Sequence, residues 1–151
     1  MLPYKGFTGT QRNRAQAWLN KQWAAGAFNR PCRCVACGQE EGLIDAHAED
    51  YSEPFEAGKI DAYHLCFTCH MMVHCRFANL FAWQRYERAI SSGIQYAAFR
   101  GRNFPAFKSA FLGESWPSPI HVGTPPSRRV LDEIHNRSEH DPTISEPRQR
   151  L

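Results

Sequence analysis

Two Cys-x-x-Cys turns restrict the fold of this 151-residue chain more than any other feature of its sequence. Cys34 and Cys37 form the first turn, with Gly38 directly behind it, and Cys66 and Cys69 form the second. A spacing of two residues lets both thiolates of a turn point at one ion, and two such turns supply the four donors of a structural zinc site. We therefore expect the chain to fold around a zinc ion held by four cysteines.

Disulfide bonds are the alternative use of these cysteines. No hydrophobic signal region opens the chain, and no apolar run is long enough for a transmembrane span, so we expect a cytoplasmic protein with no membrane partner. Metal binding is favoured because disulfides do not persist in that compartment. Cys32 and Cys75 are left over, and Cys32 could replace Cys34 as a ligand, or both are thiols flanking the site.

Three histidines form a second set of candidate metal ligands. His70 and His74 are four residues apart and share one face of a helix if the segment FTCHMMVHCRF is helical. His47 lies in IDAHA, which reads as a short strand that a hairpin could place opposite this helix. Three imidazoles leave a coordination position open, which is typical of a catalytic or substrate-binding divalent ion such as Mg²⁺, Mn²⁺, Ni²⁺ or Zn²⁺.

The order of these motifs resembles the HNH endonuclease superfamily, whose fold is a ββα-metal finger. CVACG, the segment DAHAEDYSEP and LCFTCHMMVH follow one another as in small phage and mobile-element HNH proteins, which carry HHxDYxxP before LCxxCHxxxH. The resemblance covers residues 32–76. It implies an α+β fold in which a zinc-stabilised finger is flanked by helices and the chain is mostly helical overall. It also implies metal-binding roles for His47, His70 and His74.

Two positions depart from the family pattern. The metal-side histidine is usually followed by a second histidine, the general base that takes a proton from the attacking water, and here that residue is Ala48. The family's middle asparagine corresponds to Asp61. A methyl group cannot accept a proton, so cleavage would need another side chain or a metal-bound hydroxide as the base.

Three nearby residues are candidates for a substitute base. Glu49 alternates to the same face as His47 if the strand continues, whereas Asp50 would face away. His64 lies on the second expected strand, just before the second Cys-x-x-Cys turn. The candidate catalytic residues are thus His47, His64 and Glu49. The alternative for His64 and Glu49 is that both are ordinary solvent-facing side chains.

Charge is segregated along the chain, although the net charge is only +3. Residues 1–39 contain no acid, residues 40–66 are acidic, and residues 67–112 are basic again. Basic segments on both sides of a metal finger suit a protein that contacts the phosphate backbone of duplex DNA. The candidate contacts are Arg12, Arg14, Lys21, Arg76, Arg85, Arg88, Arg100 and Arg102.

The acidic segment 40–61 fits poorly with DNA binding, because its carboxylates would repel an incoming phosphodiester. Divalent ions would offset part of this repulsion, or the segment faces away from DNA. It could also bind a basic protein partner, which leaves a regulator or inhibitor as a further function.

Helix signals outline a single zinc domain over residues 1–112. Its parts are a finger core at residues 32–76, a basic helix at residues 10–25 capped by Thr10, and further helices within residues 79–112. Residues 113–151 form a polar, proline-rich tail that we expect to be partly disordered, with one short helix at SRRVLDEIHNR.

Taken together, these patterns favour an HNH-like, zinc-containing nucleic-acid-binding protein that lacks the usual base at Ala48 and is not a catalyst. The alternatives are an active metal-dependent HNH DNA endonuclease that uses a substitute base, and a protein-interaction regulator that acts through the acidic segment.

Overall fold

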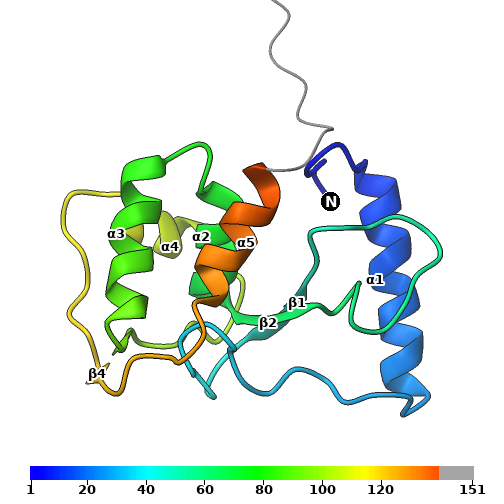
Figure 1. Cartoon of the computed structure of the whole chain (residues 1–151), viewed down its shortest axis with the longest axis horizontal. Coiled ribbons are helices and arrows are strands. Elements are labelled where there is room, and N and C mark those ends of the chain that lie inside the picture. Colours follow the sequence, from blue (N-terminus) through cyan, green and yellow to red (C-terminus); the bar gives the residue numbers. More distant parts are fainter. Residues whose placement is uncertain (140–151) are drawn as a thin grey trace, which may run out of the picture.

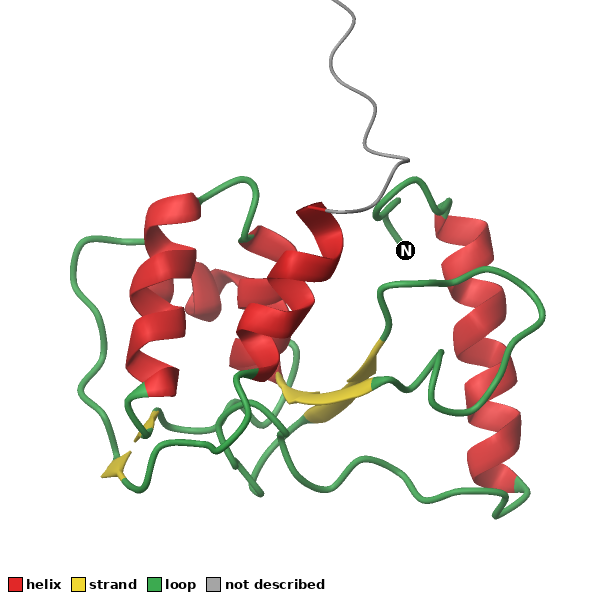
Figure 2. Ribbon diagram, in the orientation of Figure 1, coloured by secondary structure: helices red, strands yellow, loops and turns green. Residues whose placement is uncertain are grey.

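A short β-hairpin that runs directly into a helix lies at the centre of the molecule (Figure 1). Strand β1 (Ile44–His47) pairs antiparallel with β2 (Tyr63–Cys66), and α2 (Phe67–Cys75) begins at the next residue. Helix α1 (Gly9–Ala24) lies on one side of this ββα unit, and the remaining helices lie on the other (Figure 2). The hairpin therefore separates the protein into two packed regions.

The computed structural model describes residues 1–139, which form a mixed α+β fold. Helices contain far more of these residues than the two small sheets do, although they take up less than half of them. None of the helices in this part of the chain is long and apolar enough to cross a bilayer. The other elements are α3 (Leu80–Ser91), β3 (Ile94–Gln95), α4 (Phe104–Phe111), β4 (His121–Val122) and α5 (Val130–Glu139), with β3 paired to β4.

The N-cap of helix α1 lies two residues before the one that the sequence suggested. Thr8, rather than Thr10, is the N-cap: its hydroxyl accepts from the backbone N–H of Gln11, and the Gln11 side chain accepts from the N–H of Thr8. This reciprocal pair satisfies two donors that a helix start leaves unbonded. At the other end, Gly26 follows the helix with φ of +67°, a conformation that suits glycine.

Two hydrophobic cores fill the two regions. The smaller core joins α1 to the hairpin and consists of Ala15, Leu19, Ala48, Tyr51 and Ile60. The larger core lies around β2 and α2 and takes its other side chains from the first Cys-x-x-Cys turn, α3, α4 and α5. It comprises Cys34, Ala36, Tyr63, Leu65, Cys66, Phe67, Cys69, Met71, Met72, Val73, Ala82, Trp83, Tyr86, Ile90, Phe107, Phe111, Val130, Leu131 and Ile134.

Helix α5 belongs to the larger core, although the sequence suggested a polar tail from residue 113 onward. Val130, Leu131 and Ile134 are buried on the face that α5 turns toward the core. The short helix expected at SRRVLDEIHNR is thus present, and it packs against the core. The spacing of its apolar residues indicated a helix, whereas the polar composition around it did not indicate packing. The disorder expected toward the end of the chain concerns residues outside the described range.

Candidate metal centres

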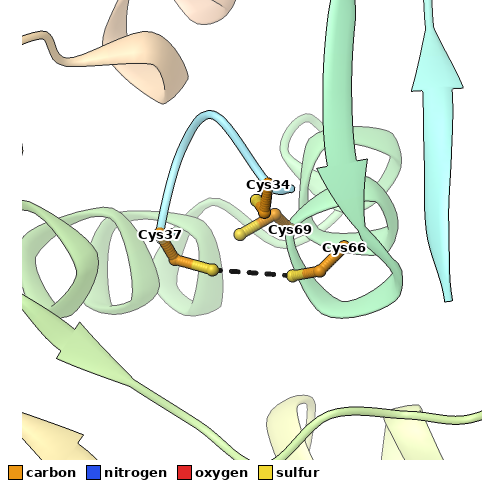
Figure 3. Close-up of side chains that lie close together, drawn as sticks. All are labelled: Cys34, Cys37, Cys66 and Cys69. Carbon is orange, nitrogen blue, oxygen red and sulfur yellow. Dashed lines mark hydrogen bonds between the residues drawn. The ribbon is translucent and has the colours of Figure 1, made fainter. Parts of the chain in front are cut away.

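Four cysteine sulfurs meet where the first Cys-x-x-Cys turn faces the start of α2 (Figure 3). The ligand atoms of Cys34, Cys37, Cys66 and Cys69 all lie within 4.8 Å of one another. The Sγ atoms of Cys37 and Cys66 are 3.7 Å apart. Cys34 and Cys69 are almost completely buried, with 1% and 0% of their surface exposed. This cysteine cluster could hold a metal ion, as the spacing of the two turns predicts.

Local backbone geometry brings the two pairs together. The first turn is closed by hydrogen bonds from Gly38 N–H to Cys34 C=O and from Cys34 N–H to Gln39 C=O, and Gly38 has φ of +79°. A hydrogen bond from Val35 N–H to the carbonyl of His64 ties this turn to β2. Cys66 ends β2 and is the N-cap of α2, so Cys69 falls in the first helical turn.

The cysteine sulfurs shift one another's pKa values, and these shifts are compatible with binding of a cation. Hydrogen bonds from Cys37, Cys66 and Cys69 hold the pKa of Cys34 well below its usual value. Hydrogen bonding to Cys34 raises the pKa of Cys66, and burial together with the same partner raises that of Cys69. The cluster therefore favours the thiolate form of Cys34 over those of Cys66 and Cys69, and a divalent ion would supply the charge needed to stabilise all four thiolates.

The other two described cysteines stand apart from this cluster. Cys32 is exposed and Cys75 is half-buried, and neither joins the four that converge. Cys34, rather than Cys32, is the buried member of the first turn, so the alternative ligand assignment is not supported.

The three histidines also converge, on the same ββα unit. His47 ends β1, while His70 and His74 come from successive turns of α2, and their ligand nitrogens lie within 4.8 Å of one another. The Nε2 atoms of His70 and His74 are 3.1 Å apart. His47 is completely buried, and the other two are partly buried. We refer to these three residues as the histidine cluster.

Carboxylates hold two of these rings in place. His47 Nε2 lies 2.7 Å from Oε1 of Glu49, and His70 Nδ1 lies 3.1 Å from Oδ2 of Asp45. Among residues 1–139, the buried Nδ1 of His47 has no hydrogen-bond partner. Carboxylates commonly orient metal-bound histidines in this way and fix which nitrogen faces the ion. An unpaired, buried imidazole nitrogen beside two other imidazoles fits a metal ligand.

Burial keeps these imidazoles in the form that binds metal. It lowers the pKa of His47 to about 4, against the opposing effect of the Glu49 hydrogen bond. Burial, followed by the nearby His70, lowers the pKa of His74 to about 2. Both rings are neutral near pH 7, and only neutral imidazole can donate its lone pair to a cation.

Glu49 has a structural role in the histidine site and is poorly suited to accept a proton. In addition to His47, its carboxylate accepts from Tyr4 Oη (2.6 Å) and forms ion pairs with Lys5 (2.9 Å) and Arg76 (3.0 Å). Burial acts to raise the pKa of Glu49, but the His47 hydrogen bond and the Arg76 charge outweigh it and hold the pKa far below its usual value. A carboxylate held so strongly in its ionised form is a poor general base.

His64 does not join the histidine cluster. In the hairpin register it lies opposite Ala46, whereas His47 lies opposite Tyr63, so His64 is on the other face of the sheet. It lines a hollow of about 650 Å³ beside the first cysteine turn, together with Cys32 and His121. One position along a strand reverses the side-chain direction, which removes His64 from the set of candidate bases.

The two positions that depart from the family pattern, Ala48 and Asp61, have structural roles, unlike the solvent-facing acid between them. Ala48 is completely buried in the smaller core, under Ala15 and Leu19 of α1. Asp50 is exposed, as the strand alternation suggested. Asp61 accepts a hydrogen bond from the backbone N–H of Gly58 at 2.6 Å and so closes the turn before β2.

The basic residues proposed as phosphate contacts fall into different groups. Arg76 is completely buried and paired with Glu49, so it is not accessible to a nucleic acid in this conformation. Three others are paired with acids, Arg14 with Glu53, Arg100 with Glu41 and Arg102 with Asp45. Arg12 is buried. Lys21, Arg85 and Arg88 have no ion pair with any carboxylate of residues 1–139, and Arg85 lies over the ring of Trp116.

These ion pairs also explain the charge segregation of the sequence. Most carboxylates of the acidic segment 40–61 face basic side chains from other segments, including Glu40 with Arg33 and Glu41 with Arg100, while Asp50 pairs with Lys59 of the same segment. The acidic segment therefore neutralises parts of the basic ones within the chain. Less negative charge remains to repel a nucleic acid or to attract a basic protein than the sequence alone indicated.

Tyr4, Lys5 and Asp45 complete the histidine site, and the sequence did not indicate them as site residues. The Tyr4 ring packs edge-on against His74, with centroids 4.6 Å apart, while its hydroxyl bonds to Glu49. Tyr4 and Lys5 reach Glu49 across more than forty residues, so no local pattern reveals them. Asp45 could have been found, because it lies two residues before His47 on the same strand.

Comparison with protein-family models, with curated proteins and with solved structures found no match. The interpretation of the two clusters thus depends on their own chemistry. Four sulfurs within a core are typical donors for a structural zinc. Three imidazoles backed by carboxylates could bind a divalent ion and leave a coordination position for water or an oxygen ligand.

Proposed function

We propose that this protein is an HNH-like metal finger of phage or mobile-element type that binds nucleic acid without cleaving it. The observation that carries the proposal is the convergence of His47, His70 and His74 on one ββα unit, whose other end carries Cys66 and Cys69 of the cysteine cluster. A hairpin and helix in this order, with ligands at these positions, is the arrangement that the motif resemblance implies.

The two clusters have separate roles in this proposal. The cysteine cluster holds a zinc ion that stabilises the fold, and the histidine cluster holds Mg²⁺, Mn²⁺, Ni²⁺ or Zn²⁺. When bound, such an ion acts as a Lewis acid toward a phosphate oxygen. Glu49 and Asp45 orient His47 and His70 so that the second nitrogen of each ring would be directed to the ion.

The surroundings of the histidine cluster support binding without catalysis. The position of the usual base is a methyl group enclosed in the smaller core, at Ala48. Glu49 is occupied by four partners, and His64 faces the opposite side of the hairpin. Of the two candidate side-chain bases, Glu49 is thus engaged by other groups and His64 faces away from the site, which supports the absence of a general base.

Nucleic-acid binding is supported by the charges that the fold leaves available. Lys21 and Arg88 are exposed and form no ion pair with a carboxylate in the described part of the chain. Such cations supply the salt-dependent affinity for phosphate backbones. A basic protein partner for segment 40–61 is less favoured, because that segment is already largely paired within the chain.

An active endonuclease remains the second candidate, because His70 lines a small cleft and a metal-bound hydroxide needs no protein base. Nicking of supercoiled plasmid in the presence of each of the four ions distinguishes the two functions. We expect no nicking beyond that of the His70→Ala variant, together with duplex binding that weakens as salt is raised. Metal-dependent nicking that His70→Ala abolishes would establish the nuclease instead.

A further inference from the structure

A cleft of about 120 Å³ opens beside the histidine cluster, between α1, β1, α2 and the start of α4. Its charged and metal-binding lining consists of Arg12, Asp45, His70 and Arg102. We propose that this cleft binds a single phosphate group, held by Arg12 from within and by Arg102 from the rim. This inference rests on the proposed function insofar as the nucleic-acid backbone is the expected source of that phosphate.

Arg12 is the buried positive charge of the cleft for which an anion would be the counter-charge. It is 8% exposed, and it forms no ion pair with any carboxylate of residues 1–139. One terminal nitrogen donates to the carbonyl of Leu2 at 2.6 Å, while its buried Nε has no hydrogen-bond partner in this part of the chain. A buried guanidinium without a counter-charge is unfavourable unless a ligand provides one.

Aromatic rings hold this guanidinium ready for a ligand. The rings of Tyr4 and Tyr51 each lie 5.2 Å from the carbon at its centre, a distance at which cation–π attraction orients the group. Tyr4 also packs against His74, so the same ring touches both Arg12 and the histidine cluster. An arginine fixed in this way loses little conformational entropy when it binds an anion.

Arg102 and Asp45 set the charge at the mouth of the cleft. The Arg102 side chain is 62% exposed and lies 2.5 Å from Asp45, whose other oxygen bonds to His70. The cleft is thus lined by two guanidinium groups and one carboxylate, and that carboxylate is shared between Arg102 and His70. The cleft keeps an excess of positive charge, and a divalent ion at the histidines would increase it.

The size of the cleft limits what can enter. A volume of about 120 Å³ accommodates a phosphate group but not a base pair. Bidentate contact to two oxygens is the way in which guanidinium groups recognise phosphate. The ligand is therefore a phosphate group, either a diester of a nucleic-acid backbone or a free phosphate monoester.

Inorganic phosphate is the direct probe, tested on the full-length, zinc-loaded protein against chloride at equal ionic strength. The informative variant is Arg12→Gln, and the matched control is Arg14→Gln, on the same helix but 61% exposed and paired with Glu53. Calorimetric titration should show phosphate binding by wild type and Arg14→Gln. In Arg12→Gln the phosphate Kd should rise about tenfold or more, as expected when a charged hydrogen-bonding partner is lost.

Arg102→Gln is the second variant, because its exposed side chain can be replaced without disturbing the core. It should raise the phosphate Kd about threefold, the size expected at a solvent-exposed position. If Arg12→Gln lacks one zinc per chain or its native circular dichroism, the result for Arg102→Gln decides alone. Wild type that binds phosphate no better than chloride would overturn the proposal. So would an unchanged Kd in every folded variant.

A competition with a short DNA duplex identifies the source of the phosphate. Displacement of phosphate by the duplex, followed by ³¹P resonance, supports a backbone diester as the ligand. Duplex binding that leaves phosphate in place supports a free monoester. A protein that binds phosphate through Arg12 but does not bind any duplex would refute the proposed function while leaving the phosphate site established.

Discussion

The two ends of the ββα unit carry ligands of different kinds in different surroundings. The cysteine cluster lies against the larger core, where Cys69 contacts the hydroxyl of the buried Tyr86 at 3.0 Å. The histidine cluster is surrounded by carboxylates and guanidinium groups and borders a cleft. One end is thus built like part of a hydrophobic core, and the other like a binding site.

A single short helix produces this difference. Cys66 and Cys69 lie at the start of α2 and point into the larger core, whereas His70 and His74, one turn apart, point toward the end of β1. Adjacent residues on a helix are about 100° apart around its axis, so Cys69 and His70 can serve separate sites. The local sequence therefore sets two metal environments at once, and the packing around each decides what it can do.

Removal of a cysteine ligand should have the largest effect on this comparison. We expect Cys69→Ala to lose the zinc and most of the cooperative fold, because structural zinc contributes about 10 kcal/mol or more, comparable to the whole stability of a domain. The zinc content by mass spectrometry and the urea unfolding curve measure this. Cys32→Ser is the control, since Cys32 is exposed and outside the cluster.

The contrast between the two ends would be lost if Cys69→Ala kept its zinc and its unfolding midpoint. His70→Ala gives the reverse comparison, since the fold and the first zinc ion should both survive it. If His70→Ala unfolded while Cys69→Ala stayed folded, the roles that we assign to the two clusters would have to be exchanged.

Replacement of Glu49 should have the next largest effect, confined to the histidine end. Glu49→Gln removes the carboxylate charge that pairs with Lys5 and with the buried Arg76, and we expect a loss of about 3–5 kcal/mol in unfolding free energy. It also weakens the partner that orients His47, so affinity for the second divalent ion should fall about 10–100-fold. Chemical denaturation and a competitive metal titration measure the two effects separately.

Asp50→Asn is the matched control, because Asp50 is the neighbouring acid but is exposed. It should change stability by less than about 1 kcal/mol. An equal effect of the two variants, or unchanged metal affinity in Glu49→Gln, would mean that Glu49 does not position His47.

The features that the sequence made predictable are those set by local spacing. The two Cys-x-x-Cys turns predicted the convergence of the four cysteines, and a separation of four residues predicted that His70 and His74 share a helix face. The hairpin followed from the motif resemblance. The position of His64 was not predictable from proximity, since its face depends on the register of the hairpin.

Features that join distant segments were not predictable from the sequence. Arg76 lies in a basic segment and resembles a phosphate ligand, yet its burial depends on Glu49, twenty-seven residues earlier in the chain. Tyr4 and Lys5 reach the same carboxylate from the N-terminal segment. The segregated charges suggested an external partner, while many of them neutralise one another once the chain has folded.

Introducing at position 48 the histidine that is usual in HNH proteins should be mildly harmful and should not create a nuclease. Ala48 is fully buried beneath α1, so Ala48→His places an imidazole in a closed core, and we expect a loss of about 1–3 kcal/mol. Plasmid nicking should stay at the background level. The control is Ala57→His, the same change at an exposed position. A stable Ala48→His variant that nicks plasmid would show that only the base is missing from the site.

Removal of a single exposed positive charge, Lys21 or Arg88, should have the smallest effect of these changes. The salt dependence of DNA binding in the two variants tests whether the nucleic acid approaches the histidine end of the molecule. Lys21 is exposed on α1, whose N-terminal half borders the phosphate cleft, whereas Arg88 is exposed on α3, which packs in the larger core. If duplex DNA approaches the histidine end, Lys21→Gln should reduce the slope of log affinity against log salt by about 0.9, the value for one phosphate contact. Arg88→Gln should leave that slope unchanged. Fluorescence anisotropy over a range of salt concentrations gives both slopes, and equal reductions would show that DNA contacts both sides of the hairpin and does not distinguish the two ends.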